Sequence, residues 1–144
     1  MTRLRCIVLG SLFTLFTPVA ALSGDFEGSN PLLCAAVKVL ECTAAEGCVE
    51  VLPAEVNAPQ FFRIDFRANT ISVTRADGGS RSTDIERVEH VDGKLILQGA
   101  EEGIEGVRDG LGWTLAIRED NGRAVLTTSG DDVAFIIFGA CTRP

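Results

Sequence analysis

His90 is the only histidine of the chain, which makes it the first residue to consider for catalysis. A serine hydrolase pairs a histidine base with a serine on a strained turn, commonly within a G-x-S-x-G motif. No such motif occurs in the sequence. His90 follows Glu89 in a segment whose residue types predict a strand, so we expect a half-exposed strand residue without a catalytic role.

Carboxylates could also perform acid–base chemistry, and they gather in turns and in the glycine-rich segment 99–112. Three of them, Glu101, Glu102 and Glu105, stand close together in that segment. A catalytic pair needs a fixed geometry around its substrate, whereas acids in a loop commonly keep the surface solvated. We therefore expect no catalytic residue, and the sequence predicts that the protein is not an enzyme.

Three short patterns resemble ion or phosphate sites, but each lacks a necessary part. The run 103–112 has the glycines of a phosphate loop without the following Lys and Ser/Thr. The turns at 120–122 and 131–132 lack the distal glutamate of a calcium loop and suit hairpin geometry. No two cysteines have the two-residue spacing of a zinc or redox motif. No metal and no cofactor are predicted.

The balance of charged residues argues against some classes of binding partner. The chain has 144 residues, 46% of them hydrophobic, which suffices for one domain with its own core. Lys and Arg number 13 against 20 Asp and Glu, a formal charge of −7. This balance offers no basic surface for a phosphate backbone or an anionic membrane. Nucleic acid is therefore not an expected partner.

Residues 1–21 have the layout of a secretory signal peptide. A short basic head precedes an apolar stretch from Cys6 to Phe16, which is shorter than the roughly 20 residues of a membrane span, and small residues then lead to Ala21. An uncleaved membrane anchor is the alternative interpretation. Cleavage after Ala21 leaves 11 basic and 20 acidic residues. We thus expect an acidic periplasmic or secreted protein without stable membrane insertion.

Four cysteines remain after cleavage, an even number in an oxidising compartment, and three pairings are possible. Cys42 and Cys48 flank a short loop, and if the segments on either side pair as a hairpin the two thiols face each other. Cys34 and Cys141 then connect the start of the domain to its end. The predicted disulfides are Cys42–Cys48 and Cys34–Cys141.

The mature chain begins with a polar, glycine-rich segment, residues 22–30, which we expect to be flexible, followed by a single domain over 31–144. Asn30 can cap a helix and Pro31 suits a first helical turn, so a short helix is predicted over residues 31–36. From Val37 onward β-branched residues favour a strand, although a longer helix fits the same letters.

Most of the remaining chain alternates polar and apolar residues with a period of two. This alternation predicts strands over residues 37–42, 48–52, 62–66, 71–74, 83–91, 94–98, 113–117, 124–128 and 133–138, with a bulge in 83–91 and a long irregular loop over 99–112. Segment 133–138 is apolar on both faces, so the N-terminal helix is expected to cover one of them. The predicted fold class is all-β: a small antiparallel up-and-down barrel or meander of about eight strands, joined by disulfides, with a sandwich as the alternative.

Six residues with inward parity are candidates to line a ligand site inside such a barrel. They are Phe62, Ile64, Phe66, Leu97, Trp113 and Leu115. Ordinary core packing is the alternative role for the three aromatic ones. Phe61 has the opposite parity, and together with Arg63 and Arg67 it forms a candidate patch for contact with a partner.

Three stretches resemble a group of small exported bacterial proteins with no assigned function: Phe61–Val73 (FFRIDFRANTISV), Lys94–Gly99 (KLILQG) and Phe138–Thr142 (FGACT). The resemblance covers most of the mature chain and implies no site residue. In architecture, the predicted sheet is also similar to lipocalin-like barrels and to exported inhibitors of lysozyme. The motif residues of those inhibitors are absent, so this similarity implies no function.

Two functions fit these observations. The first is a non-enzymatic exported binding module whose barrel holds a small apolar ligand. The second is an exported inhibitor or envelope interaction protein that presents Glu101, Glu102 and Glu105 to a basic protein partner, with charge steering the encounter.

Overall fold

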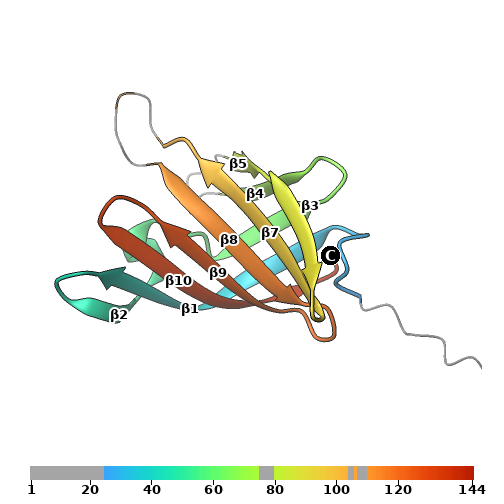
Figure 1. Ribbon diagram of the computed structural model, residues 1–144, viewed down its shortest axis with the longest axis horizontal. Coiled ribbons are helices and arrows are strands. Elements are labelled where there is room, and N and C mark those ends of the chain that lie inside the picture. Colours follow the sequence, from blue (N-terminus) through green and yellow to red (C-terminus); the bar gives the residue numbers. More distant parts are fainter. Residues whose placement is uncertain (1–24, 75–79, 104–105, 107–109) are drawn as a thin grey trace, which may run out of the picture.

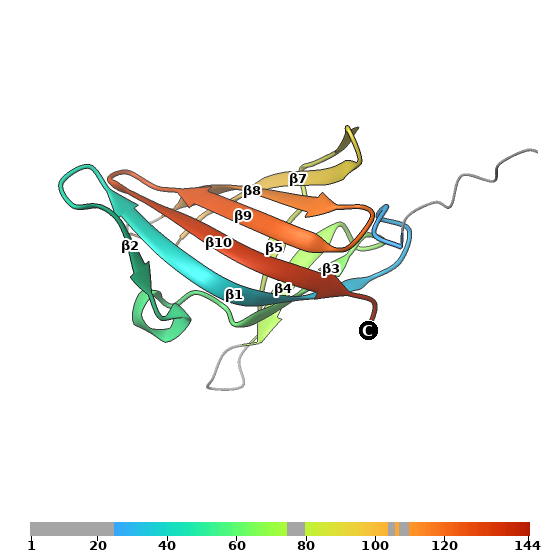
Figure 2. The same cartoon turned by 90° about the horizontal axis from the view of Figure 1, so that it is seen from below.

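The computed structural model describes residues 25–74, 80–103, 106 and 110–144, and the expected signal peptide lies outside this range. Over the described residues the chain is all-β, and its strands form one curled antiparallel sheet with the shape of a half-barrel (Figures 1 and 2). The strands are β1 (Leu32–Thr43), β2 (Gly47–Val51), β3 (Phe61–Asp65), β4 (Thr70–Thr74), β5 (Ser80–Asp84), β6 (Arg87–Val91), β7 (Lys94–Glu101), β8 (Leu111–Arg118), β9 (Arg123–Ser129) and β10 (Val133–Thr142). A 3-10 turn, η1 (Pro53–Val56), follows β2.

The sheet consists of two runs of consecutive hairpins that meet on the first strand. The strand order is β5-β4-β3-β1-β10-β9-β8-β7-β6, so β3 to β5 form one run and β6 to β10 form the other. β1 pairs with β10 along its length, whereas its first part pairs with β3 and its last part pairs with β2. The predicted antiparallel meander is therefore confirmed, with ten strands in place of about eight.

The two edges of the sheet approach each other at a corner between β5 and β6. Ile85 N donates a hydrogen bond to Asn69 O on the β3–β4 turn (2.8 Å), and the next amide, Glu86 N, donates to Gln98 O on β7 (2.9 Å). Thr83 Oγ1 on β5 adds a hydrogen bond to Ala100 O on β7 (2.9 Å). The single strand predicted over 83–91 is thus wrong: the chain bends at Ile85 because its two halves pair with opposite edges of the sheet.

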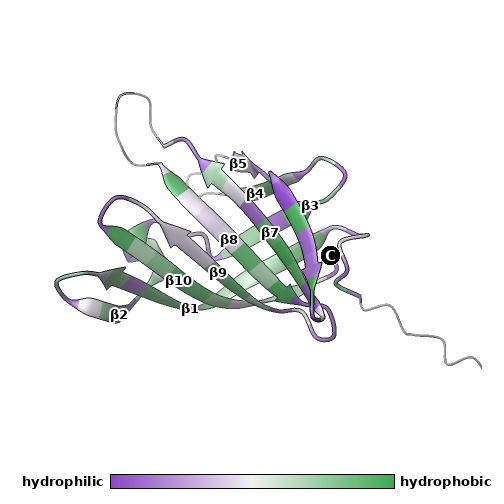
Figure 3. Cartoon of the chain, viewed as in Figure 1, coloured by the Kyte–Doolittle hydropathy of each residue, from purple (hydrophilic) through white to green (hydrophobic). Residues whose placement is uncertain are grey.

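The core lies on the concave face, because alternate residues of each strand point to it. Leu32, Ile64, Leu97, Leu115 and Ile117 are all fully buried there, and they come from four different strands. Burial of a side chain of this size stabilises the fold by about 1.5–3 kcal/mol. In the hydropathy colouring of Figure 3, the central strand β10 is green along most of its length, whereas the turns at the ends of the strands are largely purple. These contacts hold the sheet in its curled shape.

The short N-terminal helix predicted over residues 31–36 is wrong, because β1 begins at Leu32. Leu32 and Cys34 are buried while Leu33 is exposed, which is the alternation of a strand. Pairing with β3 and β10 on both sides outweighs the helical preference of the Leu and Ala residues, because local propensity is a weak term. Pro31 directly precedes the strand, where its missing N–H removes no ladder hydrogen bond.

The absence of this helix changes the surroundings of β10. The predicted cover for its second face does not exist, and β10 lies in the plane of the sheet between β1 and β9. Ile137 is buried on the concave face, whereas Phe138 points to the convex face and is exposed. The bulge also lies elsewhere than predicted: the register of β1 against β10 shifts between Ala36 and Lys38, which leaves Val37 as the extra residue.

Both predicted disulfides are present. Cys34 of β1 pairs with Cys141 of β10, and Cys42 pairs with Cys48 across the β1–β2 hairpin. In each case the two cysteines are direct partners in the strand register, so the sheet itself brings their thiols together. The hairpin predicted from the spacing of Cys42 and Cys48 is confirmed.

Candidate functional site

A cluster of exposed apolar side chains lies on the convex face of β1, β3 and β10. We call Leu33, Val37, Phe61 and Phe138 the outer apolar patch. Their side chains are 37%, 77%, 58% and 42% exposed, respectively. Large apolar side chains gathered on one exposed surface, unlike single ones, commonly mark an interaction site.

The strand register explains why these residues are neighbours. Ala35 in the centre of the patch lies directly opposite Phe61 on one side and opposite Ala140 on the other. Phe138 is two positions from Ala140 on the same face of β10. Opposite residues on antiparallel strands are roughly 5 Å apart at their Cβ atoms, so the small Ala35 leaves the flanking phenyl rings accessible.

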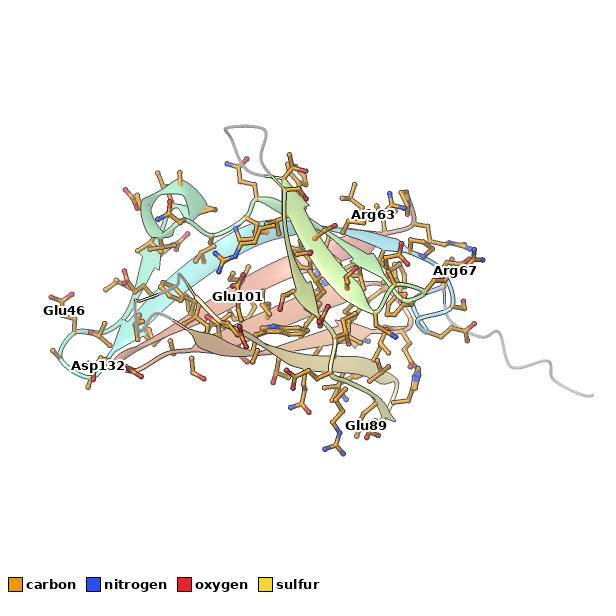
Figure 4. The ribbon with its side chains drawn as sticks, turned by 90° about the horizontal axis from the view of Figure 1, so that it is seen from above. Glu46, Arg63, Arg67, Glu89, Glu101 and Asp132 are labelled. Carbon is orange, nitrogen blue, oxygen red and sulfur yellow. A yellow bond between two sulfur atoms is a disulfide. The ribbon has the colours of Figure 1, made fainter. Side chains whose placement is uncertain are left out.

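Positive charges flank the patch. Arg63 lies directly opposite Leu33, and Arg123 lies directly opposite Ala140. Neither guanidinium forms an ion pair with another described residue, whereas Lys38, opposite Phe138, pairs with Glu50 (2.9 Å). Two unpaired arginines beside an apolar surface are notable in a chain whose formal charge is −7. Figure 4 shows Arg63 and the more distant Arg67 pointing away from the sheet.

The six residues expected to line an interior ligand site belong to the packed core. Ile64, Leu97 and Leu115 are fully buried, and Phe62 and Trp113 are almost so. Phe66 is partly buried and packs against the same cluster. Trp113 Nε1 donates a long hydrogen bond to Thr83 Oγ1 (3.4 Å), which satisfies the polar group of its indole ring. These contacts give all six a structural role in the curl of the sheet.

The three acids expected to meet a basic partner are in different situations. Glu101 is the last residue of β7, within the segment predicted to be an irregular loop, and its carboxylate forms an ion pair with Arg81 of β5. Glu102 is exposed, and Glu105 lies outside the described residues. The described part of the loop therefore presents one unpaired acid.

His90 and Glu119 form a hydrogen-bonded pair near one end of the sheet, with 2.6 Å between Nδ1 and Oε1. Half of the His90 side chain is exposed, as expected. Nearby, the guanidinium of Arg118 donates two hydrogen bonds to Asp120, and these bonds hold the pKa of the Asp120 carboxyl below its ordinary value. Among the described residues, no three His, Cys, Asp or Glu side chains are grouped closely enough to hold a metal ion.

Comparisons with known proteins give this chain no relative. No family model, no curated protein and no solved structure matches it. The resemblance to small exported proteins thus gains no support from a match, and any function must be argued from the surface itself. Helices of membrane-spanning length and hydrophobicity are absent from the part of the chain that the structure describes.

Sequence reasoning identified Phe61 of the outer apolar patch and the arginines Arg63 and Arg67, but it missed Leu33, Val37 and Phe138. Phe138 escaped notice because its segment is apolar on both faces, so parity alone does not show which face is exposed. Val37 is exposed through the β1 bulge, which no local pattern indicated. Arg123 enters the site only through the pairing of β9 with β10.

Proposed function

We propose that this protein is a non-enzymatic exported binding module whose outer apolar patch binds an acidic segment of another protein. One observation carries the proposal: Phe61 and Phe138, from strands far apart in sequence, are both exposed on the convex face, on the two strands that flank β1 and its small Ala35. Export is supported by the signal-like residues 1–21 and by two intramolecular disulfides, which are typical of oxidising compartments.

The residue types and the ordered backbone of the patch favour a protein partner. Aromatic side chains near the centre of an interface commonly contribute most of its binding free energy, because burial removes a large apolar area from water. Phe61 and Phe138 have this position, with Leu33 and Val37 as apolar surroundings. The patch lies on paired strands, so its residues are already ordered before binding and lose little conformational entropy.

The charges around the patch favour an acidic partner. A guanidinium binds a carboxylate through two parallel hydrogen bonds, and Arg63 and Arg123 have no ion pair with a described residue that would compete for them. A second copy of this chain is a poorer occupant, because it brings together two molecules of formal charge −7. We therefore commit to an acidic segment of a different protein.

The two functions expected from the sequence place binding elsewhere. An apolar ligand inside the sheet needs space among residues such as Ile64 and Leu97, which are fully buried against their neighbours. A basic partner needs free acids near residues 101–105, whereas Glu101 already pairs with Arg81. The outer patch requires no rearrangement of the fold, and this is why we place the binding surface there.

Site-specific photo-crosslinking tests the proposal. A benzophenone amino acid replaces Phe61, Phe138 or, as a control, Val91, which is 51% exposed on β6, and the protein is produced and exported in its own host. We expect positions 61 and 138, but not 91, to crosslink to one protein at an acidic segment. The affinity of that protein for Phe61→Ser should then be at least about tenfold lower than for the wild type.

Each contrary result has a definite meaning. Equal crosslinking at position 91 would show a nonspecific surface and refute the proposal. A crosslinked dimer of the chain itself would replace the acidic partner with a second copy. An unchanged affinity of Phe61→Ser would remove the patch from the interface. A small apolar molecule that co-purifies with the protein and shifts its melting temperature would favour the interior carrier instead.

A further inference from the structure

A second surface, separate from the outer apolar patch, lies on the convex face of β7, β8 and β9. It is a shallow hollow of about 400 Å³. Its lining residues are mostly polar and come from adjacent strands: Glu86, Arg87, Gln98, Gly99, Gly112, Trp113, Thr114, Thr127 and Ser129. Gln98, Thr114 and Thr127 are direct partners in the register of these strands, so their polar groups form one row across the hollow.

Gly112 creates the depth of this hollow. Its backbone does not have the positive φ that requires glycine, and a Cβ at this position would meet no atom of the described residues within 4 Å. Gly99, on the neighbouring strand, differs because a Cβ there would meet the ring of Trp113. Glycine within a strand weakens it and commonly marks close approach of a ligand or another backbone. Neither backbone geometry nor packing explains why residue 112 is a glycine. A molecule bound in the hollow would explain it.

The hydrogen-bonding capacity of the row is only partly used within the protein. Gln98 Nε2 donates to Thr114 Oγ1 (3.3 Å), which leaves the Gln98 carbonyl oxygen as an acceptor and the Thr114 hydroxyl proton as a donor. Thr127 Oγ1 donates to Thr114 O (3.4 Å) and keeps its lone pairs. Closely spaced donors and acceptors of this kind suit a molecule with several neighbouring hydroxyl groups.

The charges at the rim argue for a neutral ligand. Arg87 is paired with Glu89 (3.0 Å), and the exposed carboxylate of Glu86 adds a negative charge beside them. An anionic ligand would therefore be repelled. An apolar ligand would leave the hydroxyl and amide groups without partners, which is unfavourable. We infer that this hollow binds a neutral saccharide through Gln98, Thr114 and Thr127, over the space that Gly112 leaves open.

An NMR titration tests the inference with defined probes. The ¹⁵N-labelled protein is titrated with maltohexaose, cellohexaose and chitohexaose, and with a galacturonate hexamer as the anionic control. We expect at least one neutral oligosaccharide to shift the backbone amides of Gly112, Thr114 and Thr127 with a dissociation constant of about 1 mM or below, and the anionic hexamer to leave them unchanged.

Two variants and a control make the result specific. Gly112→Val fills the hollow without touching the fold, and Thr127→Val removes one hydroxyl of the row; each should weaken binding at least about tenfold. Ser82→Val places the same side chain at an exposed position of β5 that does not line the hollow, and this variant should bind normally. The inference is overturned if no neutral oligosaccharide shifts these amides, if the anionic hexamer binds equally well, or if Gly112→Val binds like the wild type.

Discussion

Cys34 and Cys141 are direct partners in the register of β1 and β10, and their disulfide closes a segment of 107 positions. β1 pairs in register with both runs of hairpins, with β3 of the run β3 to β5 on one side and with β10 of the run β6 to β10 on the other. The disulfide is therefore located where the two halves of the sheet meet. The Cys42–Cys48 disulfide, in contrast, closes a single hairpin.

Removal of these two disulfides should have unequal effects. In the loop-entropy model, Cys34→Ala with Cys141→Ala lowers the free energy of unfolding by about 4–5 kcal/mol, whereas Cys42→Ala with Cys48→Ala lowers it by about 2–3 kcal/mol. Urea denaturation of the two double variants measures the difference. Equal losses would show that loop length does not determine the stabilisation in this protein.

Alternation of residue types predicted most of the strands correctly, because each strand buries one face. Phe62 and Ile64 on β3 and Trp113 and Leu115 on β8 have the inward parity that the sequence assigned to them. The hairpin closed by Cys42 and Cys48 was likewise readable from local spacing. In these segments, local pattern and tertiary pairing agree, which is the condition for a correct prediction.

The errors arose where pairing between distant segments decides the structure. Residues 32–36 have good helix formers, yet β3 and β10 hold them as a strand. The bend at Ile85 depends on Asn69 and Gln98, which no local pattern connects to it. The same holds for the outer apolar patch, since its residues are neighbours only through the register of three strands.

Two glycines on adjacent strands should respond in opposite ways to an added side chain. A Cβ at Gly99 would meet the Trp113 ring and lie 2.5 Å from Asp84 O, so Gly99→Ala should destabilise the protein by about 1–3 kcal/mol. Gly112 has open space around it, and Gly112→Val should stabilise the strand by about 0.5–1 kcal/mol. Thermal unfolding measures both, and destabilisation by Gly112→Val would contradict the open geometry.

The titration of Asp120 should reveal its contact with Arg118. Hydrogen bonds from the guanidinium to Oδ1 (3.0 Å) and Oδ2 (2.6 Å) are the main cause that lowers the pKa of Asp120 below its ordinary value of 3.8. Arg118→Gln should raise this pKa, and NMR of the ¹³C-labelled carboxyl measures it.

The sign of the accompanying stability change follows from the direction of that shift. Because the folded state has the lower pKa, the contact stabilises the protein above the unfolded pKa, and this contribution is lost as pH falls through the folded value. Arg87→Gln is the matched control, since Arg87 pairs with Glu89 and leaves Asp120 untouched. An Asp120 pKa that is equal in the wild type and in Arg118→Gln would disprove the assigned cause.

Charge substitutions distinguish an acidic partner from a basic one. With the crosslinked partner in hand, Arg63→Gln should lower its affinity about tenfold, because each lost contact between a charged pair costs about 1.5–3 kcal/mol. The loss should be greater at low salt, where screening of surface charges is weaker. Isothermal titration at two ionic strengths measures both effects.

Glu102→Gln tests the alternative of a basic partner. Glu102 is an exposed acid in the segment expected to meet such a partner. For an acidic partner at the outer apolar patch, neutralising Glu102 leaves the affinity unchanged or slightly raises it, since it removes a like charge. Weaker binding by Glu102→Gln together with normal binding by Arg63→Gln would move the interface from the convex face of β1, β3 and β10 to the end of β7. The direction of these two changes therefore decides which surface of the sheet the partner contacts.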